Sequence, residues 1–470
     1  MIKKTFFALV LISGLLFNSI GILPVNAAAY GTSFTTSITY QNVGTADANV
    51  VILFYPEANG TPITITRPAL RPLAGTSVYV GSLTELSAGF KGSAVINSDQ
   101  PLVATLVQVA SSTSSVKVRP LSNGFTTGGA EVGVPTVLKN TFNTNSIVVV
   151  QNVDTNGADL TLDFVPLSGS PVQLTLTNLP SGAAKFYDLG QLTQLGTSFN
   201  GALKISAKKT GTSDPGNIVA TAMELGTTSD AAYAFEGTTT SGTKVYMPSA
   251  LCKLSGTATT AYAVQNVSTT DISVTVKYSS GINDGPFTIH SGGKQSFDGC
   301  AVNANGFLGS AIIEATGGNI VAVGKVYGGG LSTAFLGFTS GTSKVGLPYV
   351  RYTQTHWTDG TRQRAFIAIQ NVGSTDIAAG QTTVKYFDKN GNLVGTHILS
   401  SIPIGGKVNS NASMVGSAAN EFGYYSDGTF GGSAVVEGPT GSQLAVVVRI
   451  VTYVSSVEIA GEDYTGIPIP

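Results

Sequence analysis

Gln41-Asn42-Val43 occurs three more times along this chain of 470 residues, as Gln151-Asn152-Val153, Gln265-Asn266-Val267 and Gln370-Asn371-Val372. The copies begin at positions 41, 151, 265 and 370, so they lie 110, 114 and 105 residues apart. Each copy ends a short apolar segment and is followed by a polar turn. Self-similarity at a nearly constant period indicates a repeat architecture, so the sequence predicts four related units.

An alternating segment follows each copy of the tripeptide. In the third unit, Ile272, Val274 and Val276 face one way and the polar residues between them face the other. This pattern is typical of a half-buried strand. Each segment ends in an aromatic residue, which we expect to anchor the core, and a turn that supplies positive φ comes next. The aromatic residues are Tyr55, Phe164, Tyr278 and Tyr386, and the turns are Asn59-Gly60, Ser168-Gly169, Asp284-Gly285 and Asn390-Gly391.

A second motif, Phe-x-Gly, follows in the same order in all four units and opens another predicted strand. Its copies are Phe90-Lys91-Gly92, Phe199-Asn200-Gly201, Phe307-Leu308-Gly309 and Phe430-Gly431-Gly432. Helical periodicity is nearly absent, and Gly, Thr, Val and Ser dominate, which favours strands and turns. The predicted fold class is therefore all-β: four tandem immunoglobulin-like β-sandwich domains of about 110 residues, arranged like beads on a string.

This layout resembles the immunoglobulin-like repeats of bacterial surface proteins, including the CARDB-like adhesion-associated modules. The resemblance covers most of the chain after residue 28. It rests on the apolar strand that ends in Gln-Asn, the alternating strand that ends in Tyr or Phe, and the Asn-Gly-type turn. It implies a role in surface display, adhesion, or matrix and envelope assembly, and it specifies no ligand.

The amino terminus is typical of a secretory signal peptide. Lys3 and Lys4 precede an apolar run from Phe6 to Phe17, and Val25 to Ala29 offers small residues for cleavage. The run is too short for a lasting membrane span, so we expect a secreted or cell-surface product without a stable transmembrane anchor. The predicted division is 1–28 as signal peptide and 29–128, 129–243, 244–343 and 344–470 as the four sandwich repeats.

Composition narrows the classes of partner. Charged residues make up 11% of the chain and the net charge is −1, so no general field attracts nucleic acid and we expect no nucleic-acid partner. The 42% hydrophobic content argues against a disordered chain. Cys252 and Cys300 are the only cysteines, and in an exported protein such a pair predicts a structural disulfide rather than a metal or redox site.

Signals for catalysis are weak. The chain has three histidines, and neither a nucleophile elbow nor a metalloprotease helix motif accompanies them. A carboxylate pair of the glycosidase kind would have to be assembled by the fold, and the acidic residues considered for it occupy unrelated repeat positions. These residues are Glu57, Glu85, Glu314 and Glu437.

The segment Asp154 to Asp159 begins like a calcium-binding loop but lacks the bidentate acid expected further on. An Asx turn at the strand exit explains the same residues. Likewise, the repeated Gln-Asn pair is interpreted as structural, with the Asn amide bonding the loop backbone, rather than as the lining of a groove. We therefore expect no enzyme activity, no cofactor and no metal.

One segment departs from the repeat and is the candidate binding site. Residues 351–364 open the fourth unit and contain the only tryptophan and three arginines. An aromatic residue beside arginines suits binding of a sugar face, a peptide or another subunit. The alternative is a hairpin whose tryptophan packs across the junction between units three and four. The residues concerned are Arg351, Tyr352, His356, Trp357, Arg362 and Arg364.

Together these observations favour a secreted or cell-surface structural or adhesive protein without catalytic activity, acting as a spacer or as an assembly subunit. The expected partners are further copies of itself, other envelope or matrix components, or a polysaccharide. An extracellular carbohydrate- or protein-binding module and an extracellular glycan-active enzyme are the alternatives.

Overall fold

The computed structural model of the protein describes residues 28–111, 114–355, 360–416, 420–424 and 431–469. Within these ranges the regular structure consists of β-strands and a few short 3-10 turns, as the composition predicts. No helix in the described ranges has both the length and the apolar character needed to cross a membrane.

The second unit displays the complete fold, a sandwich of two four-stranded antiparallel sheets. One sheet has the order β12-β9-β14-β15 and the other has the order β11-β10-β13-β8. Its strands are β8 (Glu131–Lys139), β9 (Thr144–Asn152), β10 (Ala158–Pro166), β11 (Val172–Leu179), β12 (Ala184–Asp188), β13 (Phe199–Lys209), β14 (Ile218–Gly226) and β15 (Ala232–Glu236), with 3-10 turns η2 (Leu189–Gln191) and η3 (Thr193–Leu195).

The third unit repeats this topology with the sheets β20-β17-β22-β23 and β16-β21-β18-β19. Its strands are β16 (Lys244–Cys252), β17 (Thr259–Asn266), β18 (Ile272–Tyr278), β19 (Asn283–Ile289), β20 (Lys294–Asp298), β21 (Phe307–Thr316), β22 (Ile320–Gly328) and β23 (Leu331–Leu336).

The fourth unit adds short strands to the same plan. Its sheets are β30-β25-β26-β32-β33, with β29 also paired to β26, and β28-β27-β31-β24-β34. The strands are β24 (Lys344–Leu347), β25 (Tyr352–Thr353), β26 (Thr361–Asn371), β27 (Thr383–Phe387), β28 (Leu393–Ile398), β29 (Lys407–Ser410), β30 (Glu421–Phe422), β31 (Ser433–Glu437), β32 (Leu444–Val454), β33 (Val457–Thr465) and β34 (Ile467–Pro468), with the 3-10 turn η4 (Ala412–Val415).

The first unit has one four-stranded sheet, β4-β1-β6-β7, and one three-stranded sheet, β3-β2-β5. Its strands are β1 (Phe34–Asn42), β2 (Val50–Pro56), β3 (Ile63–Thr66), β4 (Gly75–Tyr79), β5 (Gly92–Ser98), β6 (Leu102–Ala110) and β7 (Leu121–Asn123), with the 3-10 turn η1 (Val80–Ser82).

Equivalent strands are given common names below. The tripeptide strands are β1, β9, β17 and β26, and the Phe-x-Gly strands are β5, β13, β21 and β31. The entry strands β8, β16 and β24 open units two to four, the rim strands are β3, β11, β19 and β28, and the inner strands are β7, β15, β23 and β33.

The repeated tripeptide occupies the same place in every unit. The glutamine of each copy pairs with the second residue of the neighbouring antiparallel strand, and no copy is shifted in register. The pairs are Gln41 with Val103, Gln151 with Val219, Gln265 with Val321 and Gln370 with Ala445. Because a shift of one residue would exchange the buried and exposed faces of a strand, this identity shows that the four units are built alike.

Edge-to-face aromatic pairs lie in the cores, and they correct one expected anchor. Tyr55 faces outward and Phe54 is buried in its place, with its ring 6.1 Å from that of Phe90. In the fourth unit Phe430 lies outside the described residues, and Phe422 packs against Tyr386 at 5.7 Å. The other pairs are Phe164 with Phe199 and Tyr278 with Phe307.

Close packing explains the glycine of the Phe-x-Gly motif. A Cβ atom on Gly201 would lie 2.2 Å from the carbonyl oxygen of Val165 and 2.6 Å from the ring of Phe199. A Cβ atom on Gly92 would lie 1.9 Å from the carbonyl oxygen of Tyr55. Because such contacts are not tolerated, this position excludes any residue with a side chain.

The predicted glycine turns are only partly correct. Gly169 and Gly391 adopt positive φ as expected, whereas in the first unit Ala58 rather than Gly60 does so. Gly285 has positive φ but lies inside β19, and Gly281 is the positive-φ residue of the preceding turn.

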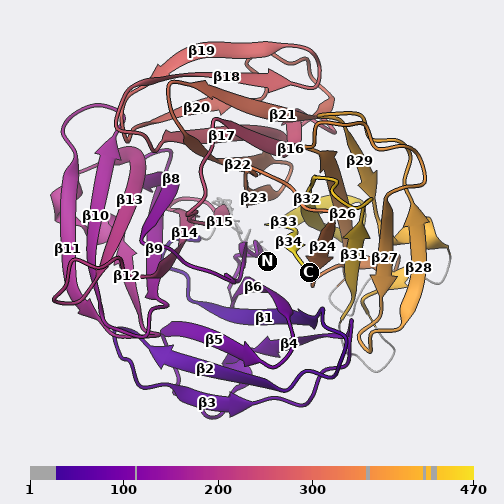
Figure 1. Ribbon diagram of the computed structural model, residues 1–470, viewed down its shortest axis with the longest axis horizontal. Coiled ribbons are helices and arrows are strands. Elements are labelled where there is room, and N and C mark those ends of the chain that lie inside the picture. Colours follow the sequence, from indigo (N-terminus) through magenta and orange to yellow (C-terminus); the bar gives the residue numbers. More distant parts are fainter. Residues whose placement is uncertain (1–27, 112–113, 356–359, 417–419, 425–430, 470) are drawn as a thin grey trace, which may run out of the picture.

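The expectation of beads on a string is wrong, because the four units close into a ring (Figure 1). The inner strands meet at its centre, where β7 contacts β15, β15 contacts β23, β23 contacts β33 and β33 contacts β7. The Asn123 amide donates to the Thr465 carbonyl at 2.8 Å and thereby joins the first unit to the last. The backbone N–H of Ala232 donates to the Ser332 hydroxyl at 3.1 Å. Rim strands lie at the periphery of the same view.

Contacts between consecutive units involve the same parts of the sandwich around the ring. A tripeptide strand, or the loop beside it, meets the Phe-x-Gly strand of the preceding unit, and the first unit meets the fourth in this way. The hydrogen bonds are Ser93 Oγ to Gly182 O at 2.7 Å, Gln265 Nε2 to Leu203 O at 3.4 Å, Ser310 Oγ to Gly405 O at 3.3 Å and Gln41 Nε2 to Ser433 Oγ at 2.8 Å. A head-to-tail contact that recurs with a closing rotation generates a ring.

Candidate functional site

The predicted binding segment is divided between two faces of β26. Arg362 and Arg364 lie on one face of this strand, whereas Gln363 between them points into the unit and is fully buried, as strand alternation requires. Arg351 belongs to the inner face, because its Nη1 donates to the side-chain Oε1 of Gln363 at 2.8 Å. His356 and Trp357 lie outside the described residues.

On the outer face, the two arginines stack on tyrosine rings. The Arg364 guanidinium lies 5.2 Å from the ring centre of Tyr352 and 5.9 Å from that of Tyr453, and Arg362 lies 5.6 Å from Tyr453. Tyr352 is only 9% exposed. Such stacking stabilises the strands and covers the aromatic faces that a sugar ring would need.

On the inner face, Arg351 lies in a buried polar network. Its guanidinium stands 4.6 Å from the ring centre of Tyr349, whose carbonyl oxygen accepts a hydrogen bond from Tyr464 at 2.7 Å. Burial lowers the pKa of Arg351. Close by, Arg119 of the first unit pairs with the buried Glu462 at 2.8 Å, so this network also links the first and fourth units.

The asparagine of the tripeptide makes the same three hydrogen bonds in every unit. In the third unit the Asn266 amide donates to the carbonyl oxygens of Thr270 at 2.7 Å and Ile289 at 3.0 Å, and its Oδ1 accepts from the Ser268 N–H at 2.8 Å. These bonds satisfy backbone groups of the turn. The equivalents are Asn42 with Ala46, Leu70 and Gly44; Asn152 with Asn156, Leu179 and Asp154; and Asn371 with Thr375, Ile402 and Gly373.

The glutamine of the tripeptide has a different role, which the sequence interpretation missed. Gln41 and Gln265 reach the neighbouring unit, as described above, and are fully buried. Gln151 and Gln370 donate to the carbonyl oxygens of Gly182 and Gly405, the two loop residues that also accept bonds from the preceding unit. Gln41 also donates to the equivalent loop carbonyl of its own unit, that of Leu73, at 3.2 Å. A glutamine repeated in all four units, with no repeated polar side chain to pair with it, was the available sequence signal for an interface.

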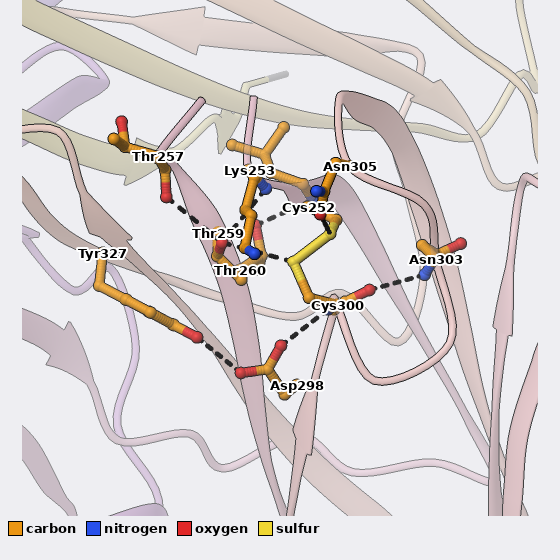
Figure 2. Close-up of a disulfide and its surroundings, with 12 residues drawn as sticks. Cys252, Lys253, Thr257, Thr259, Thr260, Asp298, Cys300, Asn303, Asn305 and Tyr327 are labelled. Atoms are coloured by element: carbon orange, nitrogen blue, oxygen red, sulfur yellow. Dashed lines mark hydrogen bonds between the residues drawn. A yellow bond between two sulfur atoms is a disulfide. The ribbon is translucent and has the colours of Figure 1, made fainter. Parts of the chain in front are cut away.

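Cys252 and Cys300 form a disulfide with a Cα–Cα distance of 4.8 Å (Figure 2). Cys252 ends the entry strand β16 in one sheet, and Cys300 follows β20 in the other, so the bond ties the two sheets of the third unit together. The Asp298 carboxylate beside it accepts hydrogen bonds from the Cys300 N–H at 2.7 Å and from the Tyr327 hydroxyl at 2.6 Å. These contacts hold the loop that carries Cys300.

The acidic residues considered for catalysis are paired with lysines. Glu57 contacts Lys91 and Lys185, Glu314 contacts Lys244 and Lys277, and Glu437 contacts Lys344 and Lys385, while Glu85 is exposed. The hydrogen bond from Lys277 lowers the pKa of Glu314, whereas a general acid needs a raised pKa. Over the described ranges, no group of three or more His, Cys, Asp or Glu residues is placed to hold a metal ion.

The calcium-like segment is occupied by its own backbone. The Asp154 carboxylate accepts the Asn156 N–H at 3.0 Å, and the Asp159 carboxylate accepts the Asn178 N–H at 2.8 Å. These bonds lower the pKa of each carboxyl group. Asp154 therefore makes the expected Asx turn, whereas Asp159 bonds to the backbone of the neighbouring strand β11, so the two carboxylates serve different parts of the backbone.

A large groove lies between the first and second units, with the end of the fourth unit, Ile467 to Ile469, also along its wall, and nothing in the sequence interpretation anticipated it. Its volume is about 1590 Å³, and its walls include β5 and the start of β6 from the first unit and parts of β9 and β14 from the second. Phe125, which follows β7, also lines it. A sequence signal for this groove was nevertheless present. Units two to four each open with an apolar segment that ends at Pro135, Pro248 or Pro348, and residues 28–41 of the first unit contain no such segment.

Comparisons with known proteins found little similarity to this chain. No family model matches it, and no curated protein matches it. Among solved structures, a tetra-tandem repeat from the extending region of a large adhesion protein aligns with 94% of this chain and 97% of its own length, at 11% identity and a TM-score of 0.10. A score this low carries no argument about fold or function.

Proposed function

We propose that the chain is a secreted or cell-surface structural protein without catalytic activity, whose rings associate with one another or with other envelope or matrix components. The observation that carries this proposal is the character of the rim strands. Each is the edge of its sheet, paired on one side only, and all four lie at the periphery of the ring (Figure 1).

These rim strands largely lack charged side chains, one of the devices by which edges avoid association, although β19 contains Pro286. β3, β11 and β28 contain no Asp, Glu, Lys or Arg, and β19 contains a single aspartate. Apolar side chains on them are exposed, including Phe287, Leu393 and Ile398. Because unpaired edges with little charge are templates for pairing with another chain, a ring with three uncharged rim strands and one that carries a single aspartate suits lateral assembly.

The two alternatives receive less support from the site. In a sugar-binding module we would expect exposed aromatic faces, whereas Tyr352 and Tyr453, which lie beside the candidate segment, are covered by Arg362 and Arg364. In a glycan-active enzyme we would expect a carboxylate pair facing a cleft, whereas Glu57, Glu314 and Glu437 each contact two lysines.

Light scattering over a concentration series tests the proposal. Each rim strand carries an exposed threonine, so the test variant combines Thr64→Lys, Thr175→Lys, Thr288→Lys and Thr396→Lys. The control carries the same added charge on the exposed turns after the tripeptide, as Thr45→Lys, Thr155→Lys, Thr269→Lys and Thr375→Lys. We expect large particles from the native chain and from the control, and dispersed rings from the test variant. A native chain that stays monomeric at every concentration, or that is dispersed equally by both variants, would refute lateral assembly.

A further inference from the structure

Among the described residues, the first unit has no counterpart of one strand that the other three units possess. In units two to four the entry strand pairs with the Phe-x-Gly strand, as β8 with β13, β16 with β21 and β24 with β31. In the first unit, over the described residues, β5 pairs with β2 and with no other strand. No strand from the described part of the chain therefore pairs with the second edge of β5, which lies along the groove between the first and second units.

The three entry strands specify what belongs at this edge. Each entry strand runs antiparallel to its Phe-x-Gly strand. It carries two apolar residues with one residue between them, and these two lie opposite the same two positions of the Phe-x-Gly strand in every unit. A proline follows the second apolar residue directly. The matched pairs are Val132 with Ile205 and Val134 with Leu203, Val245 with Ile313 and Met247 with Ala311, and Val345 with Val436 and Leu347 with Ala434. The corresponding positions of β5 are Ile96 and Ala94.

The core beneath the open edge is only half covered. Ile96 and Ala94 are both partly exposed, whereas their six counterparts in the other units are at most 1% exposed. Leu102, which begins β6, is also partly exposed, while its counterparts Ile218 and Ile320 are fully buried. Apolar side chains that every other unit buries are thus left facing the groove, and covering them is favourable.

Backbone groups on the far side of the groove are open as well. In the second and third units, the residue after the inner-strand glycine exchanges two backbone hydrogen bonds with the entry strand: Thr238 with Gly133 at 2.8 and 2.9 Å, and Phe338 with Tyr246 at 2.7 and 3.0 Å. The counterpart in the first unit is Phe125, which is 37% exposed and bonds to no strand within the described ranges. Unpaired backbone therefore flanks the groove on both sides.

The chain itself enters the first unit by another route. Lys139 precedes Gln151 by 12 residues and pairs with Phe199, whereas Ala29, which also precedes Gln41 by 12 residues, does not pair with Phe90. Instead the Ala29 N–H donates to the Ser229 carbonyl oxygen of the second unit at 2.9 Å.

We propose that this groove accepts an extended strand from a different protein, with the pattern Val-x-aliphatic-Pro shown by the entry strands. The strand would run antiparallel to β5, pair with its open edge and with Phe125, and place its two apolar side chains over Ile96 and Ala94. Main-chain hydrogen bonds supply affinity in such strand addition and alternate side chains supply specificity. β5 contains no charged residue, so the inserted face is uncharged.

A second copy is a poor donor, because the described segments of this pattern in each copy, β8, β16 and β24, are already paired within their own units. The groove is also continuous with the interface between the first two units, where Ser93 of β5 bonds to Gly182. This proposal deepens the proposed function and rests on it, since it specifies how a ring is joined to an envelope or matrix component.

A labelled peptide with the sequence of residues 243–251, Thr-Lys-Val-Tyr-Met-Pro-Ser-Ala-Leu, is the probe, measured by fluorescence anisotropy against the chain without residues 1–28. We expect saturable binding. The same peptide carrying Val245→Asp and Met247→Asp is expected to lose at least roughly tenfold in affinity, because its inward carboxylates would be buried without partners. Ile96→Glu in the protein is expected to abolish binding, and Ile398→Glu on the rim strand β28 is expected to leave it unchanged. Circular dichroism of both variants verifies that they fold.

Three outcomes overturn the proposal. The first is no saturable binding, or equal binding of the Asp-substituted peptide. The second is binding that disappears when residues 1–28 are retained, which would assign the groove to the chain's own amino-terminal segment. The third is dispersal of native particles by Ile96→Glu, which would assign it to a second copy. The lateral-assembly proposal is tested by a different experiment, the light scattering of the rim-threonine variants. Because these variants leave the groove intact, either proposal can fail without the other.

Discussion

The substitution Asn266→Ala tests whether the repeated asparagine is the residue that holds each turn. Asn266 is fully buried and makes three hydrogen bonds, to Thr270 O, Ile289 O and Ser268 N. Alanine removes all three without introducing a larger side chain. The third unit is a suitable host, because the whole of this unit lies within the described residues.

The expected loss follows from what each partner can recover. Thr270 is exposed and the Ser268 N–H is only part-buried, so water replaces the asparagine there and each lost bond costs about 1 kcal/mol. The bond to Ile289 O is buried, and an unsatisfied buried carbonyl costs about 1–3 kcal/mol. Together these give a decrease of about 3–5 kcal/mol in the free energy of unfolding of this unit.

Hydrogen exchange measured by mass spectrometry resolves this loss unit by unit, which a global melting curve of a multi-unit chain does not. Amides of β17 and β18 should exchange about two to three and a half orders of magnitude faster in Asn266→Ala, since every 1.4 kcal/mol is tenfold. The matched control is Asn319→Ala in the same unit, whose side chain is exposed. An increase of less than about tenfold, or an equal increase in the control, would refute the argument.

Three further predictions concern buried links. Cys252→Ser combined with Cys300→Ser should lower the free energy of unfolding by about 4 kcal/mol, because the disulfide closes a loop of 48 residues. Denaturant unfolding of the reduced native chain should give the same value. An unchanged stability would contradict this prediction. Arg119→Met leaves the buried Glu462 carboxylate without its ion-pair partner and should lower the free energy of unfolding by about 3–5 kcal/mol in the same assay. Adding Glu462→Leu should recover most of this loss. An equal loss in the double variant would show that the ion pair is not the cause. Burial lowers the pKa of Lys294 to about 7 from 10.5, so between these values the unfolded chain binds more protons and stability should rise with pH. Lys294→Met should flatten this rise in denaturant unfolding at several pH values and be more stable than the native chain at pH 7; a rise that persists would assign it to another group.

Strand content and unit number were predictable because they are written in local patterns. Period-two alternation, as in Ile272 to Tyr278, dictates which side chains a strand buries, and all four glutamines of the tripeptide then pair in one register. The disulfide followed from cysteine count and the inferred compartment. The tripeptide asparagine was interpretable for the same reason, since most of its partners lie within a few residues of it.

Other expectations were wrong because contacts between residues in space determine which side chains are buried and which meet. Tyr55 and Phe54 are adjacent and both aromatic, and only the direction of β2 settles which of them meets Phe90. The arginines of the candidate site were grouped by proximity in sequence, but the two faces of β26 separate Arg351 from Arg362 and Arg364.

Residue order thus prescribes four similar sandwiches, because backbone pairing within each depends on segments about 110 residues long or less. Closure into a ring depends instead on contacts such as Gln41 with Ser433 and Arg119 with Glu462, which join residues more than 340 positions apart. The repeated glutamine indicates that an interface exists, but no pattern along the chain identifies the residues that it meets in another unit. The unfilled edge of β5 is of the same kind: it becomes visible only when four equivalent sheets stand side by side and one of them is a strand short.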